Sequence, residues 1–160
     1  FVDPTDLELA LVLDKCPLDI IQLHGAEPVE RLNQLREKFG IKIMKSFPIS
    51  DGRDVLDAAD YEDTADLLLF DAKPPKSMAN ALPGGNGLVF DWKLLGARKW
   101  KKPWMLSGGM TKDTVADATR IARARIVDVS SGVERKPGVK DPALIKAFLD
   151  TVNGLTASSS

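Results

Sequence analysis

Apolar positions along the chain follow two alternating patterns. Short unbroken apolar runs, typical of strands buried on both faces, alternate with longer stretches in which apolar residues recur every three or four positions, as on one face of a helix. Leu32 and Leu35 illustrate the second pattern, and Gly40 is expected to end their helix. The short runs predict strands over residues 18–23, 41–45, 66–71, 103–106 and 126–129. The longer stretches predict helices over residues 4–15, 27–39, 54–61, 91–98, 112–124 and 142–152.

This order of elements predicts an α/β fold. A helix, or a loop and then a helix, follows each expected strand, and such regular alternation implies a parallel sheet with right-handed crossovers. Two architectures satisfy it: an open doubly wound sheet and a closed TIM (β/α)8 barrel. The Gly-x-Gly-x-x-Gly pattern does not follow the first expected strand, which weakens the dinucleotide-binding interpretation.

Composition and charge exclude several kinds of function. The 160 residues are 44% hydrophobic and 28% charged with a net charge of −1, which is typical of one globular core and gives no electrostatic attraction for nucleic acid or anionic membranes. No apolar run is long enough to span a bilayer, and no signal peptide is visible, so we expect a cytoplasmic protein. The single cysteine, Cys16, fits a reducing compartment, and one His with one Cys argues against a metal site.

The first residues resemble the end of a strand that runs into a helix. Phe1 to Pro4 contain no initiator Met, and we expect that an upstream portion of the protein is missing. We therefore expect residues 1–153 to form a single partial domain and residues 154–160 to form a disordered tail.

Asp71 is the first candidate for chemistry. It ends the apolar run that begins at Leu67, and a loop rich in Gly and Pro follows it. In parallel α/β proteins the reacting groups lie just beyond the C-terminal ends of the strands. Asp71 is therefore a candidate acid or base, and the alternative is a carboxylate that only caps the following turn.

Two Ser-Gly turns follow the last two expected strands. Glycines let backbone N–H groups approach an anion closely, and two such turns after consecutive strands can share one phosphate, as after strands seven and eight of a barrel. Counting back from these strands makes the strand at Leu18 the fourth, so about two and a half βα units, roughly 60 residues, would be absent. The alternative is two unrelated tight turns. The candidate phosphate-binding residues are Ser107, Gly108, Gly109, Ser130, Ser131 and Gly132.

Seven short motifs stand in order with matching spacing, and together they resemble the phosphoribosylanthranilate isomerase family of tryptophan biosynthesis. The resemblance covers the chain to about residue 153. The motifs are Gln22-Leu23-His24-Gly25, Asp71-Ala72-Lys73, Leu82-Pro83-Gly84-Gly85-Asn86-Gly87, Phe90-Asp91-Trp92, the segment from Pro103 to Gly109, the segment from Val127 to Glu134, and Pro137-Gly138-Val139-Lys140-Asp141.

The resemblance implies a TIM (β/α)8 barrel that carries out an Amadori rearrangement without a cofactor. N-(5′-phosphoribosyl)anthranilate becomes 1-(2-carboxyphenylamino)-1-deoxyribulose 5-phosphate, so the expected partner is a small phosphoribosyl substrate. A homo-oligomer and a fusion to a neighbouring pathway enzyme are both left open.

The resemblance also implies roles for individual residues. Asp71 matches the general acid of the family, while His24, Asn86 and Asp128 match positions near the substrate. Two plainer roles stay open: His24 bonding a backbone carbonyl to shape its turn, and Asp128 capping a short helix. The family's general base is a Cys at the end of strand one, and Cys16 does not match it. We therefore expect the 160-residue chain to be inactive alone.

Two alternatives compete with this assignment. The first is another phosphosugar barrel enzyme: a ribulose-phosphate epimerase, which would need a set of metal ligands, or an indole-3-glycerol phosphate synthase, for which Lys45 is a candidate catalytic lysine. The second is a non-catalytic, phosphate-binding barrel fragment.

Overall fold

The computed structural model describes residues 1–72 and 90–157. Its main sheet has parallel strands in the order β1-β2-β3-β4, which is also their order along the chain. The strands are β1 (Ile20–Leu23), β2 (Lys42–Ile49), β3 (Leu67–Ala72) and β4 (Trp104–Leu106). The α-helices are α1 (Asp6–Lys15), α2 (Val29–Phe39), α3 (Gly52–Ala59), α4 (Lys93–Gly96), α5 (Val115–Ala122) and α6 (Pro142–Ala157).

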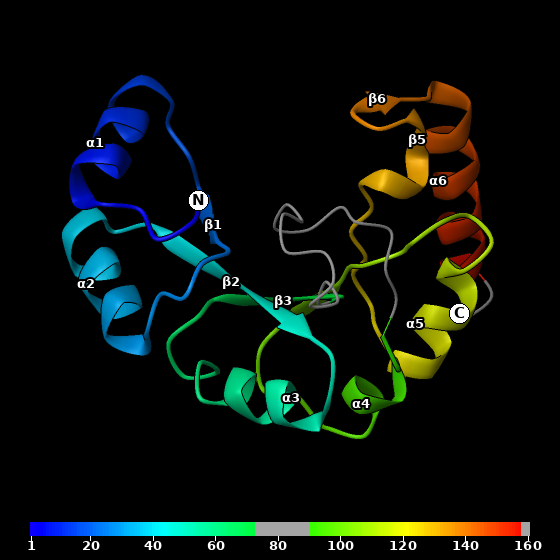
Figure 1. Ribbon diagram of the computed structural model, residues 1–160, viewed down its shortest axis with the longest axis horizontal. Coiled ribbons are helices and arrows are strands. Elements are labelled where there is room, and N and C mark those ends of the chain that lie inside the picture. The colour runs from blue at the N-terminus through cyan, green and yellow to red at the C-terminus, as the bar shows by residue number, and fades with distance from the viewer. Residues whose placement is uncertain (73–89, 158–160) are drawn as a thin grey trace.

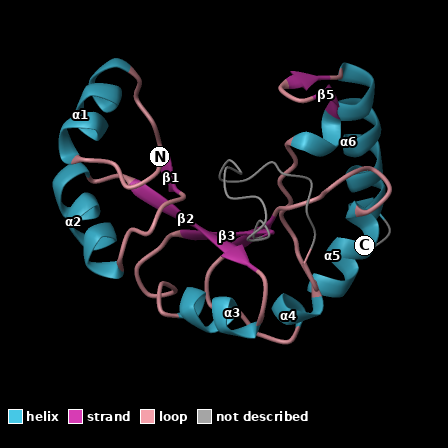
Figure 2. Ribbon diagram, in the orientation of Figure 1, coloured by secondary structure: helices cyan, strands magenta, loops and turns pink. Residues whose placement is uncertain are grey.

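The helices lie along the outer side of a curved sheet. Figures 1 and 2 show an open arc, with α1 and α2 in one arm, α5 and α6 in the other, and α3 and α4 beneath the strands between them. This arrangement confirms the predicted α/β class and the parallel sheet. None of the helices in the described ranges has both the length and the apolar character needed to cross a membrane.

One apolar core joins the sheet to its helices. Phe70, in the middle of β3, is fully buried, and its ring centroid lies 4.6 Å from that of Trp100 and 5.5 Å from that of Trp104. Burial of such side chains is the main favourable term in folding. Fully buried members of the core include Leu9, Ile21, Leu23, Leu32, Leu35, Ile43, Leu68, Leu95 and Leu106.

Ion pairs hold the segment that leads into β3. Glu62 is only 1% exposed, lies 2.7 Å from Nη2 of Arg98, and accepts a 2.6 Å hydrogen bond from the Lys101 backbone N–H. Asp66 lies 2.8 Å from Nη2 of Arg36. These contacts secure the N-terminal end of β3, the end opposite to the candidate acid.

Two expected strands differ from those observed. The strand predicted over residues 41–45 runs from Lys42 to Ile49, so Pro48 lies inside it and not in a loop. Since β1 ends opposite Lys45, the second half of β2 has β3 on one side only, and a free edge tolerates proline. The strand predicted over residues 126–129 is reduced to one parallel bridge between Leu106 and Val127, beside a β4 that is only three residues long.

Two helices are shorter than expected. The helix predicted over residues 91–98 is a single turn, α4, which ends at Gly96, where an added Cβ would lie 2.4 Å from the Ile121 carbonyl oxygen of the α5 region. The helix predicted over residues 112–124 begins only at Val115. Before it, the Thr111 N–H bonds the Thr114 hydroxyl at 2.9 Å and forms a local turn in place of the first helical turn.

The C-terminal part contains a hairpin that the sequence pattern did not predict, and its short helix begins after Ser130 without a side-chain cap from Asp128. A short 3-10 helix, η1 (Ser131–Val133), leads into an antiparallel hairpin of β5 (Glu134–Lys136) and β6 (Val139–Lys140). Helix α6 continues to Ala157, past the expected end at Val152 and into the segment expected as a tail. Phe148, Val152 and Leu155 fall on one face at helical spacing, which favours continuation of the helix.

Candidate active site

Asp71 lies near the C-terminal end of β3 and is 5% exposed. Its Oδ1 accepts a 2.8 Å hydrogen bond from the Ala72 N–H. The backbone of Gly108 packs against it, because a Cβ on Gly108 would lie 2.6 Å from the Ala72 nitrogen and 2.9 Å from Asp71 Oδ1. The carboxyl is therefore enclosed by the end of its own strand and by the turn that follows β4.

This environment favours the protonated form of Asp71. Burial raises the pKa of the carboxyl above its ordinary value, and the negative charge of Asp128 acts in the same direction. The Ala72 N–H and the His24 imidazole lower the pKa, but less than burial raises it. A carboxyl with a raised pKa can hold and release a proton closer to neutral pH than an exposed one.

His24 follows β1 directly and is half-buried. Its backbone N–H donates to the Phe1 carbonyl oxygen at 2.8 Å. Burial lowers the pKa of its imidazole; Lys45 and the Phe1 amino group lower it further, while Asp71 and Glu27 oppose them. The imidazole is thus favoured in its neutral form, within electrostatic reach of Asp71.

Ser107 connects the ends of three strands. Its N–H donates to the Phe70 carbonyl oxygen of β3 at 2.8 Å, and its Oγ donates to Asp128 Oδ2 at 2.8 Å. The N–H of Asp128 donates to the Leu106 carbonyl oxygen at 2.8 Å. The structure therefore brings Asp128, Ser107 and Asp71 to the same edge of the sheet.

The two Ser-Gly turns lie against each other. A small cavity is lined by residues 107–110 from the first turn and residues 128–131 from the second. An added Cβ on Gly132 would lie 1.7 Å from the Met110 carbonyl oxygen, so the turns touch backbone to backbone. Gly108 and Gly109 have φ values of 86° and 63°, a left-handed conformation that glycine adopts readily.

The remaining predicted positions lie elsewhere. Asn86 and its glycine-rich neighbours are outside the described residues. Cys16 is exposed at the end of α1, not at the edge of the sheet that carries Asp71. Across residues 1–72 and 90–157, no three His, Cys, Asp or Glu side chains are grouped so that they could hold a metal ion.

A buried ion pair beside His24 was not predicted. Glu27 Oε2 lies 3.0 Å from Lys45 Nζ, and both side chains are almost completely enclosed. A lysine at an apolar position of a strand was the available signal, since a buried ammonium needs a carboxylate partner. Lys45 also donates to the carbonyl oxygens of Gly25 (2.8 Å) and Ser46 (3.2 Å), so it does not project into the site as the lysine of the synthase alternative would have to do.

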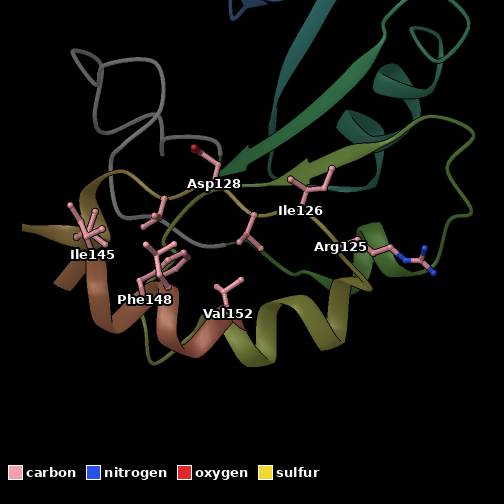
Figure 3. Close-up of a pocket in the computed structure, with 10 residues that line it drawn as sticks. Arg125, Ile126, Asp128, Ile145, Phe148 and Val152 are labelled. Atoms are coloured by element: carbon pink, nitrogen blue, oxygen red, sulfur yellow. The ribbon is translucent and has the colours of Figure 1, made fainter. Parts of the chain in front are cut away.

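A second, apolar cavity of about 440 Å³ lies between residues 125–129 and α6. Figure 3 shows Ile145, Phe148 and Val152 projecting from α6 toward this segment, while the Asp128 carboxyl points away from them. The cavity is therefore separate from the polar edge that carries Asp71. Ile145 and Leu149 are 36% and 51% exposed at its margin.

Comparison with known proteins places these features in one family. A sequence profile of N-(5′-phosphoribosyl)anthranilate (PRA) isomerase matches residues 1–151. The N-(5′-phosphoribosyl)anthranilate isomerase of Rhodospirillum centenum is 55% identical over 149 residues, which are 93% of this chain and 69% of the relative.

Solved structures agree with the sequence matches. The phosphoribosylanthranilate isomerase of Thermotoga maritima superposes with a TM-score of 0.80 at 34% identity, over 96% of this chain and 71% of that one. A phosphoribosylanthranilate isomerase in complex with reduced 1-(o-carboxyphenylamino)-1-deoxyribulose 5-phosphate gives a TM-score of 0.76 at 31% identity, over 96% of this chain and 69% of that one. These matches confirm the predicted TIM-barrel class for the curved sheet.

Proposed function

The chain belongs to the N-(5′-phosphoribosyl)anthranilate isomerase family of tryptophan biosynthesis, and on that basis we propose that its site binds the phosphoribosyl substrate of this family and contributes the general acid of the Amadori rearrangement. One observation carries the proposal. A buried carboxyl with a raised pKa, Asp71, lies within electrostatic reach of a half-buried imidazole and next to two glycine turns in mutual contact.

In the proposed reaction, Asp71 donates its proton to the furanose ring oxygen. The bond from that oxygen to C1′ breaks, and the nitrogen lone pair forms a Schiff base with C1′. Transfer of the C2′ proton to a general base, which Cys16 does not supply, gives an enolamine, which tautomerises to the 1-amino-1-deoxyribulose. The reactant and product are isomers, so the step requires no redox cofactor.

The other polar groups support binding. Backbone N–H groups of the turns at residues 108–109 and 131–132 are our candidates for holding the substrate phosphate, since such groups bind anions when glycine lets them approach. We propose that His24 and the Asp128 carboxylate, oriented by Ser107, contact the sugar or the anthranilate ring. Asn86 is a further candidate and lies outside the described residues.

Binding of the reduced product analogue tests this function directly. Isothermal titration calorimetry of the 160-residue chain with reduced 1-(o-carboxyphenylamino)-1-deoxyribulose 5-phosphate should give saturable binding that inorganic phosphate displaces. We expect Asp71→Asn to retain this binding, because asparagine keeps the shape of the side chain and the acceptor for the Ala72 N–H. Absence of binding by the unmodified chain would contradict the proposed function.

Binding without catalysis is the second candidate function for the 160 residues alone. Cys16, the one cysteine of the sequence, is exposed at the end of α1 and cannot serve as the base at the candidate site. A product-formation assay tests this second candidate: we expect the 160 residues alone to bind the analogue without turnover, and turnover would reject the non-catalytic alternative.

A further inference from the structure

Glu27 and Lys45 form an ion pair in the core, in a place that the proposed reaction does not use. The two residues are 2% and 3% exposed, and the Nζ–Oε2 distance is 3.0 Å. Lys45 pairs in the sheet with Leu23, the last residue of β1, and Glu27 stands just before α2. Two charges removed from water are costly unless they are paired and further hydrogen-bonded, so their other contacts indicate what the pair does.

Those contacts converge on the peptide groups of Gly25. The Gly25 N–H donates to both oxygens of Glu27, at 3.1 and 3.0 Å, and the Gly25 carbonyl oxygen accepts from Lys45 Nζ at 2.8 Å. Both backbone polar groups of one residue are therefore held by opposite members of the same pair. Gly25 is the residue directly after His24.

Asp3 completes the enclosure of this turn. Its N–H donates to Glu27 Oε1 at 2.8 Å, and its Oδ1 accepts from the Ala26 N–H at 2.8 Å. An added Cβ on Gly25 would lie 2.5 Å from Asp3 Oδ1, so no larger residue fits between them. The turn after β1 is thus fixed from the N-terminal segment, from β2 and from the start of α2.

The charges around His24 come from several elements. Asp71 on β3, Lys45 on β2, Glu27 before α2 and the amino group of Phe1 all act on the imidazole, together with its partial burial. Glu27 raises the pKa of His24 and Lys45 lowers it, so the two charges of the pair oppose each other in their effect on the imidazole. Loss of either charge would leave the other uncompensated.

We propose that Glu27 and Lys45 are positioning residues, whose buried pair binds the Gly25 peptide groups and thereby fixes the His24 imidazole at the edge of the sheet that carries Asp71. The relevance of this positioning to catalysis depends on the proposed function. The arrangement itself rests only on the contacts of the pair. The competing interpretation is an ion pair that stabilises the fold without any specific effect on His24.

His24 provides a direct readout because it is the only histidine of the chain. Its imidazole proton gives a single titrating NMR signal in the full 160-residue chain. We expect Glu27→Gln to lower the His24 pKa and Lys45→Met to raise it, because each variant removes one of two opposing charges. Hydrogen exchange at the Gly25 amide should accelerate about tenfold or more in Glu27→Gln, since one of the two oxygens that accept this N–H becomes an NH2 group and the charge that holds Lys45 is lost.

Glu62→Gln is the matched control. It removes the charge of another buried carboxylate, Glu62, whose partner Arg98 is 35% exposed, and neither residue is among the groups that act on His24. The control should lower thermal stability as Glu27→Gln does, but leave the His24 pKa and Gly25 exchange unchanged. Glu27→Asp should keep most of the electrostatic effect while losing Gly25 protection, because it retains the charge on a shorter side chain. Changes of the same sign in the His24 pKa of both pair variants, or equal changes in the control, would overturn the proposal.

Binding of the reduced product analogue separates this inference from the proposed function. If both are correct, the unmodified chain binds and Glu27→Gln binds at least about threefold more weakly, while Glu62→Gln is unaffected. If the chain does not bind but the opposite changes in the His24 pKa are present, the proposed function fails and the positioning role stands. If the chain binds and the pair variants change neither His24 nor Gly25, the positioning role fails and the function stands.

Discussion

Replacing Gly108 by alanine tests how closely the turn after β4 packs on the candidate acid. Two separate costs are expected. Gly108 has a φ of 86°, and a left-handed backbone costs a non-glycine residue roughly 1–2 kcal/mol. The new Cβ would also lie 2.6 Å from the Ala72 nitrogen, a backbone atom held in β3, and overpacking of this kind typically costs about 1–3 kcal/mol.

Gly138→Ala separates the two costs, because it carries the cost of the left-handed backbone but not the cost of overpacking. Its φ is 77°, and no atom lies within 4 Å of an added Cβ. We expect Gly138→Ala to lower the free energy of unfolding by about 1–2 kcal/mol and Gly108→Ala by about 2–5 kcal/mol. The difference between these two losses in the free energy of unfolding measures the cost of the close approach of the turn to the end of β3.

Urea unfolding followed by tryptophan fluorescence measures both variants. Trp100 and Trp104 pack on Phe70, one residue before Asp71, so their emission reports on the relevant part of the core. The midpoint should fall more for Gly108→Ala while the slope with urea stays constant. Equal losses in the two variants would refute the reasoning, since the contact with Ala72 would then contribute nothing.

Four other outcomes are expected. Gly109→Asp should weaken binding of the reduced product analogue tenfold or more, about 1.4 kcal/mol, because it adds a negative charge at the proposed phosphate turn; calorimetry that gives an unchanged Kd would move the phosphate site elsewhere. Because burial raises the pKa of Asp71 in the folded state, its ionisation destabilises the fold as pH rises above the unfolded value. The stability of Asp71→Asn relative to the unmodified chain should therefore increase as the pH rises through the ordinary pKa of an aspartate, about 3.9, until Asp71 also ionises in the folded chain. The increase is about 1.4 kcal/mol for each tenfold difference between the acid dissociation constants of Asp71 in the folded and unfolded chains, and denaturation series that show a constant difference would contradict this. The 160-residue chain alone should form no product in a discontinuous assay, since Cys16 lies away from the site, and substantial turnover would show that another base acts. The chain should self-associate in sedimentation experiments, and Leu149→Lys, at the margin of the apolar cavity, should reduce this association; identical sedimentation of the two proteins would exclude the cavity as the contact.

The order of elements was predictable because hydrophobic periodicity reports burial directly. The run from Leu67 to Phe70 is apolar since both faces of β3 are covered, and Gly40 ends α2 with a φ of 63°, the conformation that glycine favours. The lengths of the strands were harder to predict from the sequence. Pro48 usually signals a loop, but the absence of β1 beside the second half of β2 leaves an edge that tolerates it, and this is a property of the assembled sheet.

The candidate site was predictable where a single residue at a strand end carries the signal. Asp71 is such a residue, and its role as an acid remains a prediction. Contacts between segments far apart in the sequence were not predictable. The bond from Ser107 to Asp128 and the pair of Glu27 with Lys45 depend on register and loop path, which a local pattern does not encode.

The contact of Gly132 with the Met110 carbonyl oxygen constrains how this part of the protein can change over evolutionary time. The two turns are separated by α5, yet the first turn occupies the space that Gly132 in the second turn would need for even one added methyl group. An insertion in either turn would have to be accompanied by a matching rearrangement of the other. Variation in length is therefore expected at other loops first, and the two turns are expected to be inherited as one unit.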